Sequence, residues 1–115
     1  MSLKKVLLLV VSIAVTAAFS FVSPAFAADT ANGAKLFAAN CNACHGGGAN
    51  YVLSQKSLSV EDMEQYLDGY SQDHVGSIAY QISHGKGSMP AFGRLSDEQV
   101  NDIAAYVEEQ AQNGW

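Results

Sequence analysis

The sequence predicts an all-α fold, and three observations lead to that prediction. Residues that cap helices precede several stretches of the chain, apolar side chains recur at helical spacing within those stretches, and glycine-rich segments separate them. Nowhere do apolar and polar residues alternate for long enough to predict a strand, and the sequence lacks a strand–helix–strand order. A chain of 115 residues forms at most one domain, so we expect a single small domain of helices.

The first three predicted helices begin at capping residues and end close to glycine. The fourth has the clearest pattern, because Ser96 and Gln99 form a capping box at its start. Its apolar stripe consists of Val100, Ile103, Ala104, Val107 and Ala111. The other three predicted helices span about Thr30–Cys44, Ser59 to about Gly69, and about Asp73–Ser83. Asp29 or Thr30 caps the first of these, and Gly85 ends the last. Residues 46–58 and 85–93 are expected to form irregular loops.

The N-terminal segment has the pattern of a secretory signal peptide. The basic pair Lys4–Lys5 precedes an apolar stretch over residues 6–22, and residues 25–27 form the small-x-small motif that signal peptidase cleaves. The alternative is an uncleaved membrane anchor, since the stretch is close to the shortest length that spans a bilayer. A helix-breaking proline and the motif favour cleavage. We expect a signal peptide over 1–27 and an exported mature domain, not membrane-spanning, over 28–115.

The mature domain is acidic, which restricts its partners. It keeps all eleven Asp and Glu residues but only four of the six Lys and Arg residues, so its net charge is −7. This balance argues against nucleic acid as a partner, because the phosphate backbone is also negative. It suits a protein that meets other proteins through complementary charge.

The only two cysteines lie in the sequence Cys41-Asn42-Ala43-Cys44-His45. At about 100° per residue on a helix, Cys44 lies roughly −60° and His45 roughly +40° from Cys41, so the three side chains share one arc. Two thiols on one face can bond to the two vinyl groups of a haem, and the adjacent imidazole then reaches the iron from the same side. We therefore expect one covalently attached haem c per chain, with His45 as an axial iron ligand.

Three other uses of the cysteines remain open at this point. A structural zinc site takes four N or S ligands, and His74 and His84 would have to complete it without typical spacing. A thioredoxin-like redox pair would need a βαβ pattern. A disulfide forms readily in an exported protein but leaves His45 without a role. Haem attachment accounts for all three residues and would stabilise a small domain rich in alanine and glycine.

Four side chains of the mature domain could provide the second axial ligand: Met63, Met89, His74 and His84. Met63 lies within a predicted helix and is expected to fill the core. The two histidines are expected to be solvated near helix ends. Met89 lies in a glycine-containing loop, where a following proline favours extended backbone. We expect Met89 to be the ligand, with an ordinary apolar loop contact as the alternative. His/Met ligation raises the reduction potential and leaves no open coordination position, which predicts a one-electron carrier and not an enzyme.

Three segments of the chain resemble the cytochrome c6 family. They are "GAKLFAANCNACHGGG" (33–48), "YQISHGKGSMPAFGRLSDEQV" (80–100) and "IAAYVEEQAQNGW" (103–115), and the resemblance covers essentially all of 28–115. It implies a class I cytochrome c fold of about four helices around one haem. In that fold the first and last helices cross, and Gly33 and Phe37 would meet Tyr106 there.

The resemblance also implies a function and further site residues. Family members carry electrons from the cytochrome b6f complex, through cytochrome f, to photosystem I in the thylakoid lumen, a periplasmic-side compartment, and some also feed a terminal oxidase. Gln81 would lie beside the haem and tune it, and Arg94 would assist docking to photosystem I. The plain alternatives are a solvated glutamine and a solvated arginine. We expect Phe92 to form part of a small apolar contact beside the exposed haem edge of a monomer.

Two other functions stay open from the sequence. The chain could be a divergent c-type cytochrome whose shifted potential serves another redox partner, including a larger complex in which it is a permanent subunit. It could instead be a ligand-binding or peroxidase-like haem protein with a labile methionine. Rapid binding of carbon monoxide or cyanide would identify the second of these.

Overall fold

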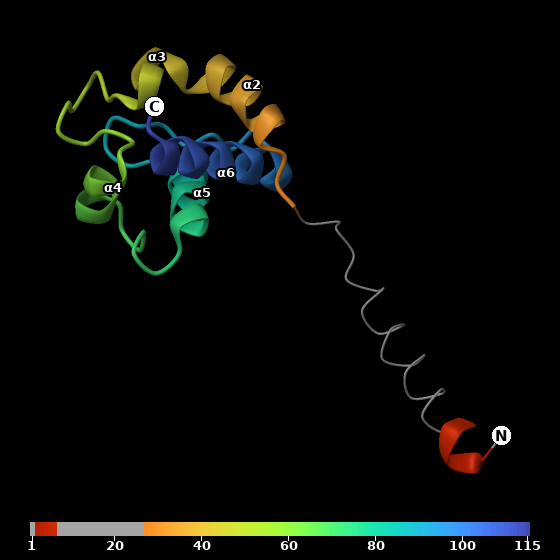
Figure 1. Cartoon of the computed structure of the whole chain (residues 1–115). Helices are drawn as coiled ribbons and strands as arrows, with labels where there is room; N and C mark the ends of the chain where they lie inside the picture. The colour runs from red at the N-terminus through yellow and green to blue at the C-terminus, as the bar shows by residue number, and fades with distance from the viewer. Residues whose placement is uncertain (1, 7–26) are drawn as a thin grey trace.

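The computed structural model describes residues 2–6 and 27–115 (Figure 1). The predicted signal peptide, 1–27, lies mostly outside the described residues and stays a prediction. Among the described residues no helix is long and apolar enough to cross a membrane. Over 27–115 the structure is helical, which confirms the all-α prediction: α2 (Thr30–Asn40), α3 (Asn42–His45), the 3₁₀ turn η1 (Gly46–Gly48), α4 (Val60–Tyr66), α5 (His74–His84) and α6 (Asp97–Asn113).

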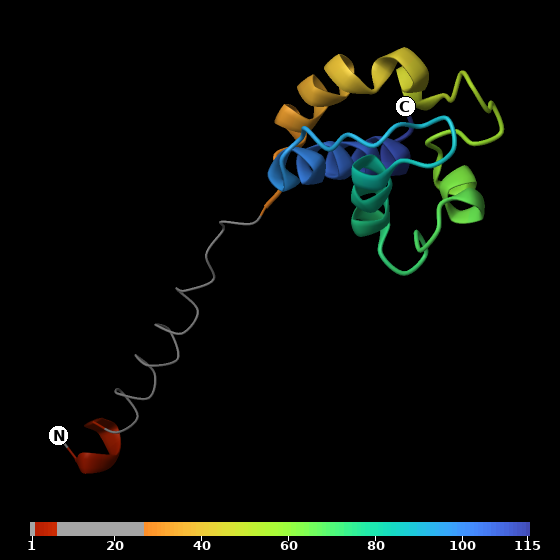
Figure 2. The same ribbon diagram turned by 180° about the vertical axis from the view of Figure 1, so that it is seen from behind.

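Helices α2 and α6 cross at the centre of the domain, as the two views of the ribbon show (Figures 1 and 2). Gly33 makes this crossing close, because a Cβ atom there would overlap the backbone oxygen of Asp102 and lie 2.9 Å from Cβ of Tyr106. One turn later, the rings of Phe37 and Tyr106 have centroids 5.4 Å apart. The predicted contact of Gly33 and Phe37 with Tyr106 is therefore confirmed.

The core lies where α5 and α4 meet the crossed pair. The predicted apolar stripe of α6 is buried, except that Ala111 is only partly covered. Burial of this stripe, more than helix propensity, holds α6 in place. The buried apolar residues are Phe37, Met63, Tyr70, Ile78, Ile82, Val100, Ile103, Ala104 and Val107.

Capping interactions set most helix ends where the sequence predicts them. Ser96 and Gln99 form both halves of a capping box on α6. The carboxylate of Asp73 accepts a hydrogen bond from the Gly76 N–H at 2.9 Å and starts α5. Gly85 ends α5 with φ of 70°, a conformation that glycine adopts without strain. These ends depend on local hydrogen bonds, so sequence patterns predict them well.

Two predicted helices differ from the structure. The first does not run unbroken to Cys44: it ends at Asn40, and Cys41 has φ of −117°, far from the helical value. After this break a new short helix, α3, begins: the N–H groups of Cys44 and His45 both donate to the Cys41 carbonyl, at 3.2 and 2.9 Å. The second helix ends at Tyr66, because Leu67 takes an extended conformation and packs on the core.

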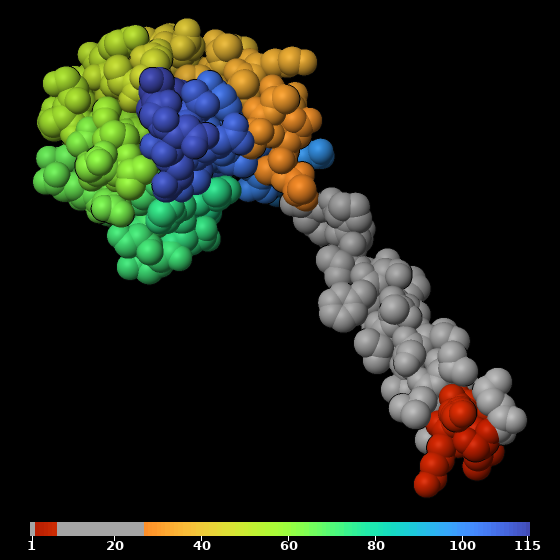
Figure 3. Space-filling model, in the orientation of Figure 1, coloured from red at the N-terminus to blue at the C-terminus, as the bar shows by residue number. Residues whose placement is uncertain are grey.

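The C-terminal Trp115 fastens the 46–58 loop to the crossed helices. Its Nε1–H donates to the Leu58 carbonyl at 3.0 Å, and its ring lies 5.4 Å from that of Phe37. A Cβ atom at Gly48 would overlap the indole, so glycine is required where the loop passes under it. Figure 3 shows the end of the chain seated between this loop and α2.

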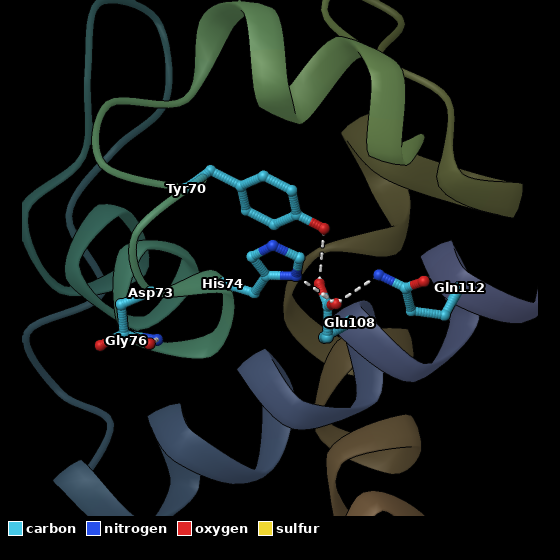
Figure 4. Close-up of polar contacts among 6 residues, drawn as sticks. All are labelled: Tyr70, Asp73, His74, Gly76, Glu108 and Gln112. Atoms are coloured by element: carbon cyan, nitrogen blue, oxygen red, sulfur yellow. Dashed lines mark hydrogen bonds and ion pairs between the residues drawn. The ribbon is translucent and has the colours of Figure 1, made fainter.

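A polar cluster joins α6 to the start of α5 (Figure 4). The Glu108 carboxylate accepts hydrogen bonds from Tyr70 Oη and Gln112 Nε2 and contacts His74 Nδ1, each at 2.7 Å. The ring of His74 also stacks on Tyr70, with centroids 4.1 Å apart. His74 was expected to be solvated, and this holds in part: a carboxylate and an aromatic ring contact it, while 38% of its side-chain surface stays exposed.

The pKa of Glu108 reflects two opposing effects. Burial alone would raise it, but hydrogen bonds from Tyr70, His74 and Gln112 outweigh burial, and the pKa lies below its ordinary value. Burial, with the Glu108 carboxylate beside it, raises the pKa of Tyr70, so the phenol stays a donor. A carboxyl group with a lowered folded-state pKa stabilises the fold above its unfolded-state pKa of about 4.3, and this contribution is lost as the pH falls through the folded-state value.

The change Glu108→Gln is expected to lower the free energy of unfolding by about 1.5–3 kcal/mol at pH 7, since hydrogen bonds to a charged acceptor are lost. Part of the acid dependence of stability below about pH 4.3 should disappear with it. Denaturant titrations between pH 2 and 7 measure both effects. The adjacent, exposed Glu109 supplies the control Glu109→Gln, which should behave like the wild type. Equal acid dependence in wild type and Glu108→Gln would contradict this account.

Candidate functional site

A cavity of about 540 Å³ opens between α3, α4, α5, α6 and both loops. Its wall is largely apolar and includes the buried Met63, Ile78, Ile82, Ile103 and Val107. A space of this size and character is typical of a cofactor site. The structure brings six of the predicted site residues to it: Cys41, Cys44, His45, Gln81, Met89 and Phe92.

The two cysteine thiols reach the cavity from the tight turn between α2 and α3. Cys41 is half-buried and Cys44 is exposed, and both are free thiols in the structure. Burial, reinforced by the neighbouring Cys44, raises the pKa of the Cys41 thiol to about 11. The raised pKa reflects the loss of solvent around the Cys41 sulfur atom at the cavity wall.

His45 is oriented by the glycine turn that follows it. Its Nδ1 lies 2.9 Å from the Ala49 carbonyl oxygen, which can only accept, so Nδ1 carries the proton. The lone pair is then on Nε2, the nitrogen that can bind a metal. The backbone N–H of Tyr51 also bonds back to the Cys44 carbonyl at 3.0 Å and fixes the loop against the motif. The loop thus selects the tautomer of His45 that an axial ligand needs.

Met89 reaches the cavity from a tightly folded segment of the second loop. Lys86 and Met89 exchange two backbone hydrogen bonds of 3.0 Å. Gly85 allows this turn, because a Cβ atom there would lie 2.5 Å from the Met89 oxygen. The Gln81 Nε2 atom lies 3.8 Å from Met89 Sδ, so the amide N–H donates a weak hydrogen bond to the thioether sulfur. Gln81 therefore contacts the sulfur atom proposed as an iron ligand and restricts its position.

Phe92 and Arg94 occupy different environments. Phe92 is half-buried: it lines the cavity, and its backbone N–H donates to the Ile82 carbonyl at 3.0 Å. Arg94 is exposed and lies outside the cavity wall, with Nη2 3.5 Å from Oδ1 of Asn40. Asn40 itself lines the cavity, so this contact places the Arg94 cation close to the rim. A shallow hollow of about 330 Å³ over residues 90–94 adjoins it.

The other candidates for the second iron ligand either lie away from the cavity or are buried in the hydrophobic core. Met63 lines the cavity but is buried in the core, as expected. His74 is engaged by Glu108, and His84 is exposed, stacked on Tyr80 with centroids 3.8 Å apart. Within residues 2–6 and 27–115, no group of three or more His, Cys, Asp or Glu side chains could hold a metal ion. The zinc alternative therefore has no ligand cluster in that part of the chain.

Sequence reasoning missed part of the cavity wall. Val52, Leu53 and Lys56 come from the 46–58 loop, and Tyr66 from the end of α4. Lys56 Nζ lies 5.3 Å from the ring centroid of Tyr66, a cation–π contact. The sequence signal that could have predicted this part of the wall is the adjacent apolar pair Val52–Leu53 in the loop. Apolar side chains in a loop tend to pack against another surface.

The residues present fit a haem. An apolar wall suits the porphyrin, two free thiols suit its two vinyl groups, and an imidazole and a thioether are a known axial pair for haem iron. A thioether is a poor ligand for zinc or magnesium, which prefer other donors. The donor set therefore selects haem iron over those metals.

Comparisons with known proteins agree with this chemistry. Residues 28–107 match the family model for cytochrome c oxidase, cbb3-type, subunit III. Cytochrome c6 from Thermosynechococcus vestitus is 51% identical over 114 residues, which cover 98% of this chain and 98% of that protein. Cytochrome c6 from Synechococcus elongatus is 56% identical over 89 residues, covering 76% of this chain and 98% of that protein.

A solved structure extends the comparison to the fold. Cytochrome c6 from the diatom Phaeodactylum tricornutum superposes with a TM-score of 0.72 at 46% identity, covering 76% of this chain and 99% of that one. The resemblance noted in the sequence is thus confirmed in both sequence and fold. The chain belongs to the cytochrome c6 family, and it is therefore a haem-containing electron-transfer protein and not an enzyme.

Proposed function

We propose that this protein is a soluble, monomeric carrier of single electrons that serves photosynthesis in the thylakoid lumen. It takes electrons from cytochrome f of the cytochrome b6f complex and delivers them to photosystem I, with a terminal oxidase as an additional acceptor. The observation that carries the proposal is the cavity that collects Cys41, Cys44, His45 and Met89 from two segments of the chain. The family assignment supplies the class of partner.

Each of these residues has a distinct role in the proposal. Cys41 and Cys44 would hold one haem c through thioether bonds at the turn after α2. His45, with its Nε2 lone pair free, and Met89 would bind its iron. The haem supplies one-electron exchange between ferric and ferrous iron. Gln81 donates to the Met89 sulfur atom, so it influences how much electron density that sulfur atom offers to the iron.

Filling both axial positions with protein atoms restricts the chemistry. Neither oxygen nor peroxide has a coordination position while His45 and Met89 remain bound. The apolar wall of the cavity stabilises the less charged ferrous state, and Met/His ligation raises the reduction potential further. The chain therefore holds and releases an electron with little other reactivity.

Docking is assigned to the rim of the cavity around Phe92 and Arg94. Binding there should be weak and brief, because a carrier must leave after each transfer. The exposed guanidinium of Arg94, held near the rim by Asn40, provides positive charge on an otherwise acidic domain. It should steer encounter with a partner surface that carries negative charge.

The change Arg94→Glu tests this route. We expect the second-order rate of flash-induced photosystem I reduction to fall by about tenfold at low salt, with the difference shrinking as salt is added, because a rim charge acts mainly on association. Lys35→Glu, an equal charge change on the exposed side of α2, is the matched control and should alter the rate much less. Equal effects of the two variants would remove Arg94 from the docking surface. No reduction of photosystem I by the wild type would overturn the proposed route.

A further inference from the structure

Asp102 is a carboxylate buried at the crossing of α2 and α6. Its side chain belongs to a residue that is only 5% exposed, although it lies on a helix whose outer face is in solvent. Asp102 Oδ1 accepts a hydrogen bond from the Asp29 backbone N–H at 2.8 Å, and Oδ2 accepts one from Asn32 Nδ2 at 2.9 Å. The carboxylate thus holds the first residues of the domain against α6.

This carboxylate has only neutral donors around it. Over residues 2–6 and 27–115, the ion pairs are His74 with Glu108 and Lys86 with Asp68, and neither involves Asp102. A second carboxylate, that of Asp29, lies in the same segment and caps α2 by accepting from the Asn32 N–H at 3.0 Å. A buried charge is normally compensated by an opposite one. The site therefore has two carboxylates, and neither forms an ion pair within the described part of the chain.

We propose that Asp102 binds the α-ammonium group of the mature chain at Ala28. Cleavage after Ala27 would turn the Ala28 amide nitrogen into a cation, one residue before the Asp29 N–H that already contacts Asp102. Consecutive backbone nitrogens lie within about 4 Å of each other, so the ammonium forms beside the carboxylate. Ala28 is exposed and, once terminal, is free to turn toward it.

The consequence is that removal of the leader stabilises the fold. The uncleaved chain has a neutral amide at this point, whereas the mature chain has an ion pair across the crossing that Gly33 makes close. Cleavage of the leader thus adds an ion pair between the start of the mature chain, just before α2, and Asp102 on α6. The inference depends on cleavage after Ala27 and is independent of the route that electrons take.

The test compares four mature holoproteins: free or acetylated at the Ala28 amine, each with Asp102 or with Asp102→Asn. Acetylation removes the positive charge and leaves the backbone intact. In the Asp102 protein we expect acetylation to raise the unfolding equilibrium constant by about tenfold, the size of a hydrogen bond to a charged group. In Asp102→Asn it should change that constant by less than about twofold. The readout is guanidinium denaturation followed by circular dichroism.

A charge control separates this ion pair from general electrostatics. Asp97→Asn removes an exposed carboxylate in the first turn of the same helix, and the acetylation effect there should equal that of the wild type. An equal effect of acetylation with Asp102 and with Asn at this position would overturn the proposal. So would a native mature protein whose mass shows an N-terminus other than Ala28.

A second measurement needs no variant, in case Asp102→Asn folds poorly. The α-amino pKa of the wild type, measured by NMR, should lie above the ordinary range of about 7.7–8.0. The charged groups on the two elements that meet there are Asp29 and Lys35 from the α2 side and Asp97, Glu98, Asp102, Glu108 and Glu109 from α6. Only Asp102 among the carboxylates is buried, and it is expected to dominate. An ordinary or lowered α-amino pKa would overturn the proposal.

Discussion

Replacing Gly33 by alanine is expected to lower the free energy of unfolding by at least about 3 kcal/mol, the upper part of the range for overpacking. The added methyl group would overlap the backbone oxygen of Asp102, and a backbone atom within α6 cannot move aside as a flexible side chain can. Relief requires α2 and α6 to separate, which would loosen the contact of Phe37 with Tyr106. Folded domains have a free energy of unfolding of about 5–15 kcal/mol, so a loss of this size removes a large share of it.

Guanidinium denaturation of the holoprotein measures this effect. Gly93→Ala is the matched control, because a Cβ atom at Gly93 would have no neighbour within 4 Å. The control should stay within about 0.5 kcal/mol of the wild type. If Gly33→Ala were as stable as Gly93→Ala, the close crossing of α2 and α6 would be wrong.

Replacing Met89 by alanine is expected to have the largest effect on redox behaviour. Removal of the thioether should lower the midpoint potential by on the order of 100 mV or more, because the axial ligand sets haem potentials over about 0.8 V. It should also open a coordination position, so carbon monoxide should bind the reduced protein rapidly. At about 59 mV per tenfold change in a one-electron equilibrium constant, such a shift would prevent reduction by the proposed donor.

Met63 provides the control for that experiment. It is the other methionine on the cavity wall, and Met63→Leu removes a thioether while keeping a similar volume. We expect the potential to move by at most a few tens of millivolts, that is, less than tenfold in the equilibrium constant, and carbon monoxide not to bind. A reversed result, with Met63→Leu lowering the potential and Met89→Ala leaving it unchanged, would make Met63 the ligand and not Met89.

Features that depend on neighbouring residues were predictable from the sequence. The caps at Asp29, Ser59 and Ser96 each bond to the backbone N–H three residues further on, so residue type and spacing are sufficient to find them. The same kind of reasoning selected the two thiols and the imidazole of residues 41–45 from their spacing, and Met89 from the glycines and the proline around it. The structure places all four residues on one cavity wall, and their roles toward a haem remain part of the proposal.

Features that depend on tertiary contacts were not predictable. The break at Cys41 lies within residues 34–45, a run with no glycine or proline, so no residue type in that run signals it. Glu108 is one of several acids on α6, and nothing in the local sequence sets it apart. Tyr70 and His74, more than thirty residues away, make it a partly buried acceptor. Asp102 is similar, because its partners near the start of α2 are about seventy residues distant.

The measurement that tests the central claim most directly is a potentiometric titration of the purified mature protein, followed by its visible absorbance. The account predicts a c-type haem spectrum, a positive midpoint potential, a single one-electron transition and no reaction with carbon monoxide, because His45 and Met89 both stay on the iron. A c-type spectrum with a low midpoint would contradict His/Met ligation and the transfer of electrons to photosystem I. The absence of any haem spectrum, from cells able to attach haem, would contradict the assignment of Cys41, Cys44 and His45.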